Sequence, residues 1–174
     1  MTVVPEIAII MGSDSDLPTM EAAIQVCEAF DLPCHVEIIS AHRTPHRMVE
    51  FAEQAHRLGI KVIIAGAGGS AHLPGMVAAI SPLPVIGVPV KSRSLQGLDS
   101  LYSIVQMPAG IPVATVAIGN AQNAGLLAIQ ILAAQRPALL EAVLGYRQSL
   151  AQKVQDKQAK LADLGHAAYL AHYE

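Results

Sequence analysis

Short apolar runs alternate with longer amphipathic stretches along the first 135 residues. The runs are rich in Val and Ile and predict five β-strands, at 6–11, 35–39, 61–65, 85–88 and 113–117. The stretches between and after them predict helices near 16–30, 45–58, 72–81, 96–105 and 120–135. Runs that are apolar throughout are typical of parallel strands covered by helices on both faces. The pattern therefore predicts a three-layer, doubly wound α/β sheet of about five parallel strands.

The pattern changes at Pro137. Residues 138–165 carry apolar side chains near one helical face, which predicts one long amphipathic helix; these are Leu140, Leu144, Ala151, Val154 and Leu161. We therefore expect a single α/β domain over 1–136, with a flavodoxin-like strand order as the leading hypothesis. Residues 137–174 would form a helical extension that packs either on the same subunit or on a neighbour.

Charged residues are few and unevenly spread. The chain is 52% hydrophobic and 14% charged, against about 25% charged in ordinary domains. This composition excludes a disordered chain, and a net charge of −3 argues against nucleic acid as a partner. Residues 61–135 hold four charges, on Lys61, Lys91, Arg93 and Asp99. We favour burial of this segment against other subunits; the alternative is a sheet enclosed by apolar helices.

Other sequence features favour a cytoplasmic protein. The apolar runs fall short of the ~20 residues that a membrane-spanning helix needs. The N-terminus lacks the basic region of a signal peptide. Cys27 and Cys34 have no second pair, so neither a disulfide framework nor a zinc site is expected. We therefore expect no membrane partner.

Polar residues follow the first predicted strand. In open α/β sheets ligands bind outside the carboxyl ends of the strands. Residues 12–18 contain Ser13, Ser15 and Asp16, which either cap the next helix or bind a ligand there. Hydroxyls at a helix N-terminus suit phosphate, whereas the carboxylate of Asp16 would repel phosphate and is better matched to sugar hydroxyls.

The second strand is followed by Ser40, His42 and Arg43. Arg43 offers a permanently charged fork that suits a phosphate dianion. His42 titrates near neutrality, so it is a candidate general acid and base. The alternative is a helix-capping loop with a solvated His–Arg pair.

A glycine-rich stretch follows the third strand, over residues 66–75. It matches G-x-G-x-x-A, but it follows the third strand and has no acid about 20 residues further on, which argues against a dinucleotide site. We expect instead a backbone that approaches a planar or anionic ligand closely and offers N–H donors. His72 is either a second reactive imidazole or a structural residue. The histidines are scattered, so no metal site is predicted.

Long strings in these loops carry a family resemblance. MGSDSD, SAHRTP and AGAGGSAHLPGM, followed by GVPV and SLYSIVQMPAGIPVATVAIG, closely resemble the bacterial N5-carboxyaminoimidazole ribonucleotide mutases of purine biosynthesis. The similarity runs from about residue 5 to residue 135. It implies an isomerase that moves a carboxyl group from the exocyclic nitrogen of an aminoimidazole ribonucleotide to ring carbon C4. It also implies that no cofactor or metal is needed.

The resemblance further implies a role for each loop residue. His42 matches the general acid and base of the family. The substrate contacts would be Ser13, Ser15, Ser40 and Arg43 near the 5′-phosphate, Asp16 at the ribose, and Gly68, Gly69, Ala71, His72 and Leu73 along the base and carboxylate. The family assembles as a homo-octamer in which a neighbouring subunit closes each site.

Two other functions stay open at this point. Relatives that carboxylate aminoimidazole ribonucleotide with free carbon dioxide carry Lys at the position of Arg43, so that residue favours the mutase. A non-catalytic module that binds nucleotide phosphates would have the same fold and phosphate loop. Such a module has no need of a proton shuttle, and His42 beside Arg43 therefore argues for an enzyme.

Overall fold

A computed structural model describes residues 4–171. The chain forms two compact units, Met1–Leu132 and Ala133–Glu174. The first contains a parallel sheet in the order β2-β1-β3-β4-β5, the predicted flavodoxin-like order. Its strands are β1 (Ile7–Met11), β2 (Cys34–Ile38), β3 (Val62–Gly68), β4 (Val85–Val90) and β5 (Ala114–Thr115). Within residues 4–171, no helix is both long and apolar enough to cross a membrane.

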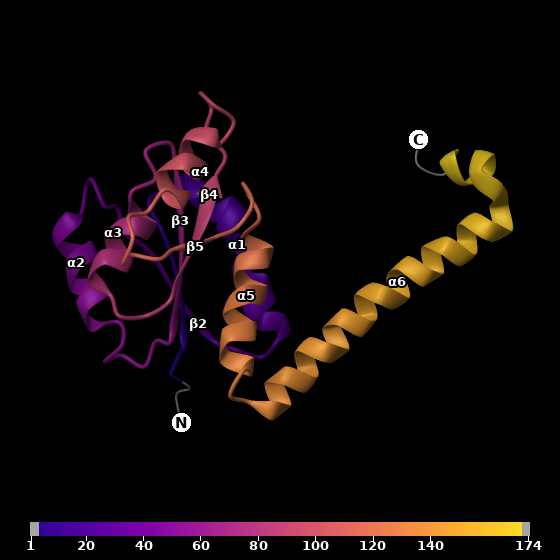
Figure 1. Cartoon of the computed structure of the whole chain (residues 1–174), viewed down its shortest axis with the longest axis horizontal. Coiled ribbons are helices and arrows are strands. Elements are labelled where there is room, and N and C mark those ends of the chain that lie inside the picture. Colours follow the sequence, from indigo (N-terminus) through magenta and orange to yellow (C-terminus); the bar gives the residue numbers. More distant parts are fainter. Residues whose placement is uncertain (1–3, 172–174) are drawn as a thin grey trace. The chain divides into compact units, whose positions relative to one another are not determined.

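Helices cover both faces of the sheet, as predicted for a doubly wound fold. In Figure 1, α1 and α5 lie on one side of the strands and α2 and α3 on the other. A short 3-10 helix, η1 (Asp14–Asp16), precedes α1. The α-helices of this unit are α1 (Leu17–Ala29), α2 (Pro45–Gln54), α3 (Leu73–Ile80), α4 (Leu98–Val105) and α5 (Ala121–Ala133). All five agree with the predicted helices to within a few residues, apart from the earlier end of α2.

Alternating side chains of the central strands fill the two halves of the core. On β1 all five residues are fully buried. Ala8 and Ile10 belong to the cluster that also holds Phe51 of α2 and Val77 of α3. On the other face α5 packs closely on α1, since a Cβ at Gly125 would lie 2.9 Å from the Cβ of Val26. Burial of both faces explains why the strands are apolar throughout.

Strand β3 is longer than predicted. The glycine-rich stretch was expected to begin a loop at Gly66, but β3 continues to Gly68, paired with Val88 and Val90 of β4. A Cβ at Gly66 would lie 2.3 Å from the Sδ of the buried Met20. Glycine therefore serves here to admit the side chain of Met20, and the true loop begins at residue 69.

Strand β5 is shorter than predicted. Only Ala114–Thr115 pairs regularly with β4. The chain nevertheless continues beside β4, because the N–H of Val116 donates to the Gly87 carbonyl and that of Gly119 to the Pro89 carbonyl, at 3.1 and 2.8 Å. The apolar run at 113–117 therefore predicted the strand correctly, but not how few of its residues pair regularly with β4.

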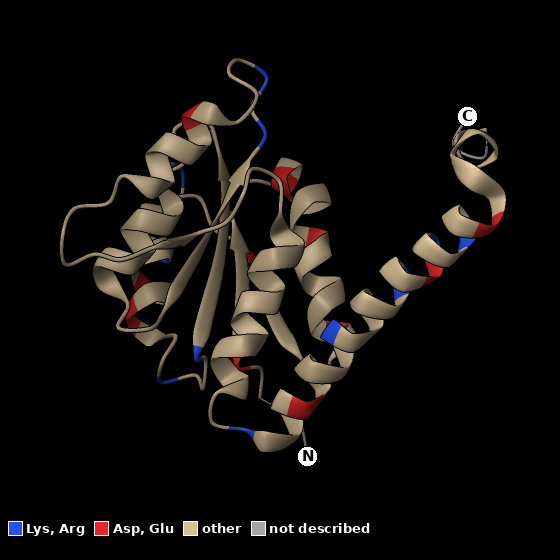
Figure 2. Ribbon diagram, turned by 45° about the vertical axis from the view of Figure 1, so that its right-hand side comes forward, with Lys and Arg blue, Asp and Glu red and all other residues tan. Residues whose placement is uncertain are grey.

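The second unit consists mainly of α6 (Pro137–Leu170). Its backbone departs from helical geometry at Gly165, where φ is +72°, at the residue where the amphipathic pattern was predicted to end. Apolar side chains of the predicted face are exposed in this chain, including Leu140, Leu144 and Val154. Figure 2 shows Lys or Arg and Asp or Glu residues of both signs spread along α6.

Candidate functional site

One pocket of about 550 Å³ collects the loops that follow β1, β2, β3 and β4. It lies at the carboxyl ends of these strands, where ligands bind in open α/β sheets. Of the residues predicted for the site, the pocket lining includes Ser13, Ser15, Asp16, Ser40, His42, Arg43, Gly68, Gly69, His72 and Leu73. The three predicted loops, which are distant in sequence, therefore meet at one place together with the loop after β4.

The loop after β1 is organised by a capping box. The Ser13 hydroxyl accepts the N–H of Ser15 at 3.4 Å, and the Asp16 Oδ2 accepts the N–H of Ser13 at 3.1 Å. The capping alternative is thus correct for these residues, and it is compatible with ligand contact because both line the pocket. Burial raises the pKa of the Asp16 carboxyl.

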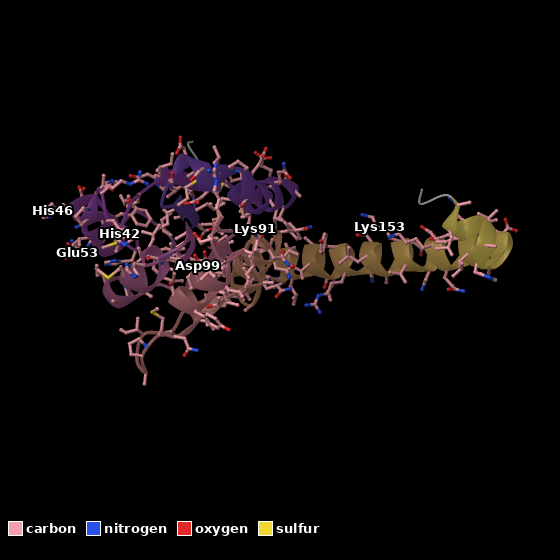
Figure 3. All side chains as sticks on the ribbon, turned by 90° about the horizontal axis from the view of Figure 1, so that it is seen from above. His42, His46, Glu53, Lys91, Asp99 and Lys153 are labelled. Atoms are coloured by element: carbon pink, nitrogen blue, oxygen red, sulfur yellow. The ribbon has the colours of Figure 1, made fainter. Side chains whose placement is uncertain are left out.

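The loop after β2 fixes the guanidinium of Arg43. Its Nη2 donates to the Gly12 carbonyl at 3.0 Å, and its Nε donates to the Ser40 hydroxyl at 3.3 Å. These contacts hold the side chain over the neighbouring β1 loop, while Arg43 stays exposed to the pocket. His46 is an exposed residue of α2, and Figure 3 shows it at the outer edge of the unit, farther out than His42.

Two histidines from different loops contact one another in the pocket. His42 Nε2 lies 2.7 Å from His72 Nδ1, with the rings edge to face. A hydrogen bond between neutral imidazoles requires one facing nitrogen to carry hydrogen and the other to lack it. His72 makes no side-chain cap to α3, which begins at the next residue. Its imidazole therefore belongs to the pocket and to the contact with His42.

The loop after β3 differs from the prediction in two respects. Its expected N–H donors are engaged within the chain: Gly69 donates to the Ser100 hydroxyl at 2.8 Å, Ala71 to the Gly69 carbonyl and His72 to the Ser70 carbonyl. Ala71 is absent from the pocket lining because its side chain is packed in the hydrophobic core. The loop thus contributes small, closely packed walls, and these three N–H groups are not free for a ligand.

The loop after β4 was missed as a part of the site. Lys91, Ser92 and Arg93 all line the pocket. The sequence did contain a pointer to this loop: Lys91 and Arg93 are two of the four charged residues in 61–135, and both lie shortly after a predicted strand. Ser92 is held by Asp99, whose Oδ1 accepts its hydroxyl at 2.6 Å, and this hydrogen bond lowers the pKa of Asp99.

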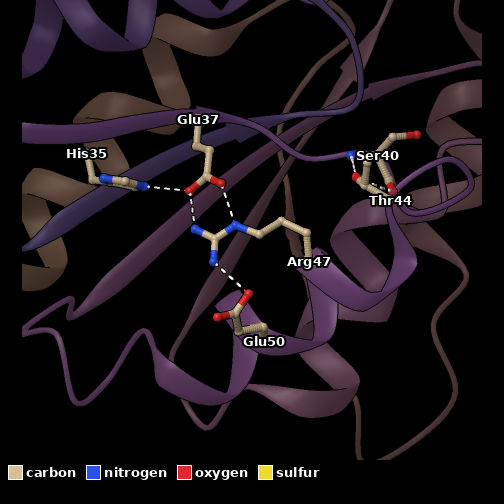
Figure 4. A network of polar contacts seen from close by, with 6 residues as sticks. All are labelled: His35, Glu37, Ser40, Thr44, Arg47 and Glu50. Atoms are coloured by element: carbon tan, nitrogen blue, oxygen red, sulfur yellow. Dashed lines mark hydrogen bonds and ion pairs between the residues drawn. The ribbon is translucent and has the colours of Figure 1, made fainter.

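Other titratable groups of the first unit lie outside the pocket lining. Burial raises the pKa of the Cys27 thiol to about 12 and also raises that of Cys34, which makes both poor nucleophiles. Figure 4 shows Glu37 of β2 in an ion pair with Arg47 of α2, at 2.7 Å. Within the described part of the chain, no group of three or more His, Cys, Asp or Glu residues could hold a metal ion.

Comparison with known proteins places the chain in a family. A family model described as AIR carboxylase matches residues 6–153. An N5-carboxyaminoimidazole ribonucleotide mutase of Synechocystis sp. is 72% identical over 166 residues, which are 95% of this chain and 94% of that protein. Another from Thermotoga maritima is 55% identical, over 98% of this chain and 99% of that protein.

Two further comparisons extend this similarity. A phosphoribosylaminoimidazole carboxylase of Saccharomyces cerevisiae is 57% identical over 95% of this chain but only 29% of its own length. A crystal structure of Treponema denticola PurE superposes with a TM-score of 0.83 at 32% identity, covering 90% of this chain and 98% of that one. The matched model and the relatives span most of the sequence, and the chain therefore belongs to the AIR carboxylase family.

Proposed function

We propose that this protein converts N5-carboxyaminoimidazole ribonucleotide to 4-carboxy-5-aminoimidazole ribonucleotide. The observation that carries the proposal is the contact of 2.7 Å between His42 and His72 in the pocket that also holds Arg43. A proton-transferring pair next to an anion-binding group is what a carboxyl migration on a phosphorylated substrate needs. Relatives that carry the mutase name, at 72% and 55% identity, support the same reaction.

Arg43 is assigned to the 5′-phosphate of the ribonucleotide. Its Nε and Nη2 are tied to Ser40 and Gly12, so the guanidinium is oriented before the substrate arrives and its remaining donors are left for the ligand. Pre-orientation of this kind reduces the entropy lost on binding. The hydroxyls of Ser15 and Ser40 add further donors around the phosphate. The Ser13 hydroxyl donates to Asp14 Oδ1 at 2.9 Å and would have to turn from it to reach the phosphate. Asp16 accepts from the ribose hydroxyls.

His42 carries the proton in both directions. It first protonates the carbamate nitrogen, whose bond to the carboxyl carbon breaks and releases carbon dioxide inside the pocket. Ring carbon C4 then attacks the carbon dioxide, and His42 removes the C4 proton to restore aromaticity. The enzyme must therefore switch His42 between donor and acceptor during each turnover.

Giving its proton to the carbamate nitrogen leaves His42 as the base that then takes the C4 proton, so the two steps together restore it. The contact of His42 Nε2 with His72 Nδ1 at 2.7 Å holds the imidazole in place for both steps. Small walls at Gly68 and Gly69 let the backbone close around the base and keep carbon dioxide near C4.

Assembly into a homo-octamer is also proposed, with the catalytic function in residues 1–136 and a helical extension over 137–174. Large apolar side chains stay exposed on α3 and α4, including Met76, Leu98 and Tyr102, which is 60% exposed. Together with the exposed face of α6, they favour burial against other subunits. A cytoplasmic location fits an enzyme of nucleotide synthesis. Native mass spectrometry tests the assembly, and a monomer would contradict it.

The reaction itself is tested without ATP by two parallel assays. One receives the N5-carboxylated ribonucleotide, and the other receives aminoimidazole ribonucleotide with bicarbonate; both are read for the C4-carboxylated product. Fast product from the first assay alone supports the mutase. Product mainly from the second assay would favour the carboxylase activity that the name of the Saccharomyces relative describes. Binding of the ribonucleotide without product in either assay would leave a non-catalytic nucleotide-binding module.

The role of His42 is tested by His42→Asn, with His46→Asn as the matched control. His46 is an exposed histidine of α2 outside the pocket lining. We expect His42→Asn to lower kcat by at least about a thousandfold, in the upper range for a lost general acid and base, with ribonucleotide affinity and assembly near normal. His46→Asn should match the wild type. Wild-type turnover by His42→Asn would remove His42 from the mechanism.

A further inference from the structure

Ser70 lines the pocket and has two hydrogen-bond donors without a partner. It lies in the loop between β3 and α3 and is exposed. Among residues 4–171, neither its backbone N–H nor its hydroxyl makes a hydrogen bond. The N–H groups of Gly69, Ala71 and His72 are all engaged within the chain. Ser70 therefore offers a ligand two donors in a loop whose neighbouring N–H groups are already used.

The backbone around Ser70 is held on both sides. On one side, the N–H of Gly69 donates to the buried Ser100 hydroxyl at 2.8 Å, and the Ser103 hydroxyl lies 3.3 Å from the Gly69 carbonyl. On the other side, the Ser70 carbonyl accepts the N–H of His72 at 2.8 Å. The two donors of Ser70 thus start from a fixed backbone, which reduces the entropy lost when a ligand binds.

The proposed reaction places the carboxylate of the substrate beside the two histidines. The carboxyl carbon is bonded to the nitrogen that His42 protonates, so it lies within reach of the contact between His42 and His72. Ser70 precedes His72 by two residues, and two residues of chain span at most about 7 Å. Ser70 therefore stands on the side of the pocket where the carboxyl group leaves nitrogen and joins C4.

The other hydroxyls of the pocket lining are placed or engaged differently. Three belong to the loops after β1 and β2, where the phosphate is assigned: Ser13, Ser15 and Ser40. The fourth, on Ser92, already donates to Asp99 Oδ1 at 2.6 Å. Of the five, only the hydroxyl of Ser70 lies on the same loop as His72. It is thus the pocket hydroxyl best placed for the carboxylate.

We propose that the Ser70 hydroxyl donates a hydrogen bond to the carboxylate of the ribonucleotide, while the N–H of the same residue donates to the second oxygen. This inference rests on the proposed function, which supplies a carboxylated ligand. An ionised carboxylate accepts through both oxygens, and hydrogen bonds to it are stronger than those to neutral groups. Ser70 therefore selects the carboxylated ribonucleotide over aminoimidazole ribonucleotide, which lacks this group.

The contact acts on binding more than on the chemical step. Substrate and product both carry the negative carboxylate, whereas the carbon dioxide between them is uncharged and accepts hydrogen bonds weakly. Stabilisation by Ser70 is therefore greatest in the bound substrate and product, and it does not lower the barrier between them. Ser70 determines specificity and takes no part in proton transfer.

The kinetic test compares Ser70→Ala with Ser94→Ala in the full chain. Ser94 is an exposed serine outside the pocket lining. We expect Ser70→Ala to raise KM for the N5-carboxylated ribonucleotide about tenfold, the scale for a hydrogen bond to a charged group, without lowering kcat more than about twofold. Ser70→Thr keeps the hydroxyl and should stay within about threefold of the wild-type KM. Ser94→Ala should match the wild type.

Calorimetry separates recognition of the carboxylate from recognition of the rest of the ribonucleotide. His42→Asn serves as the background for these measurements, because it prevents conversion of the ligand. There, Ser70→Ala should weaken binding of 4-carboxy-5-aminoimidazole ribonucleotide about tenfold, and binding of aminoimidazole ribonucleotide less than about twofold.

An unchanged KM in Ser70→Ala would overturn the inference, and so would equal losses of affinity for the two ribonucleotides. The second result would mean that the hydroxyl serves another part of the ligand. Circular dichroism and native mass of Ser70→Ala should match the wild type, because Ser70 is exposed. Failure of the proposed function is distinguishable: the wild type would then not convert the N5-carboxylated ribonucleotide, while calorimetry would still report whether Ser70 recognises a carboxylate.

Discussion

The buried hydroxyl of Ser100 joins two parts of the site, and its removal should be costly. Ser100 is fully buried on α4; its Oγ donates to the Val90 carbonyl at 2.7 Å and accepts the N–H of Gly69 at 2.8 Å. It therefore ties the glycine-rich loop to the end of β4. Ser100→Ala removes a single atom, so the loss of packing is small and the effect comes from hydrogen bonds.

The expected cost follows from which groups lose a partner. The N–H of Gly69 loses Ser100 Oγ as its acceptor. The carbonyl of Val90, a buried residue, loses Ser100 Oγ as a donor. Leaving a buried polar group unsatisfied costs about 1–3 kcal/mol. Gly69 is half-buried, so water can replace part of its loss. We expect Ser100→Ala to lower the free energy of unfolding by about 2–3 kcal/mol.

Urea unfolding followed by circular dichroism at one fixed protein concentration measures this change. Ser103→Ala on the same helix is the control, because Ser103 is half-buried and its hydroxyl donates to the Asp99 carbonyl within α4 at 2.8 Å, with only a longer contact of 3.3 Å to the Gly69 carbonyl. It should lose less than about 1 kcal/mol. A loss in Ser100→Ala no larger than that of Ser103→Ala would refute the reasoning. In addition, KM should rise in Ser100→Ala, because Gly69 lines the pocket.

Three further predictions concern Arg43, Glu37 and Gly87. Arg43→Ala should raise KM about 10- to 100-fold with little change in kcat, because a phosphate contact persists through the reaction. Steady-state kinetics measure both constants, and a fall in kcat alone would contradict the assignment of Arg43 to the phosphate. The ion pair with Arg47 lowers the pKa of the Glu37 carboxyl below its usual value of 4.5. The wild type should therefore have a larger free energy of unfolding than Glu37→Gln above pH 4.5, and this difference should be lost as pH falls through the lowered pKa. Urea titrations of both proteins at several pH values measure this difference, which should be about 0.5–1 kcal/mol at pH 7. A difference that does not shrink in acid would exclude the ion pair as its source. Gly87→Ala should lower the free energy of unfolding by about 1–3 kcal/mol, because the new Cβ would lie 2.4 Å from Ile104 Cγ2. The control Gly145→Ala, where a Cβ would meet nothing within 4 Å, should raise it by about 0.5–1 kcal/mol. Equal urea midpoints for the two variants would argue against this packing.

The fold was predictable because burial on both faces leaves a clear mark in a parallel sheet. Apolar runs located all five strands, and the two-faced burial of β1 shows why. The pattern failed where a distant side chain decides the local structure. Gly66 was expected to start a loop, but it lies in β3, and the residue there is glycine because Met20 occupies the space that a Cβ would need.

The site was predictable to the extent that single loops reveal their own chemistry. Ser40, His42 and Arg43 are adjacent in sequence, and their polar character at a strand end was visible. The contact between His42 and His72 joins residues 30 apart, and Ser100 reaches Gly69 across 31. No local pattern reports such a pairing, since it depends on how α3 and α4 pack beside the strands.

The two edges of the sheet have a consequence for how the chain avoids misassembly. An open strand edge can recruit the strand of another molecule and begin aggregation. Here β5 offers only Ala114–Thr115, which is too short to template a partner. At the other edge β2 carries Glu37, which Arg47 anchors to α2 (Figure 4). A newly made chain with this sheet is therefore protected at both ends against edge-to-edge polymerisation, and ordered assembly is left to surfaces of helices and loops.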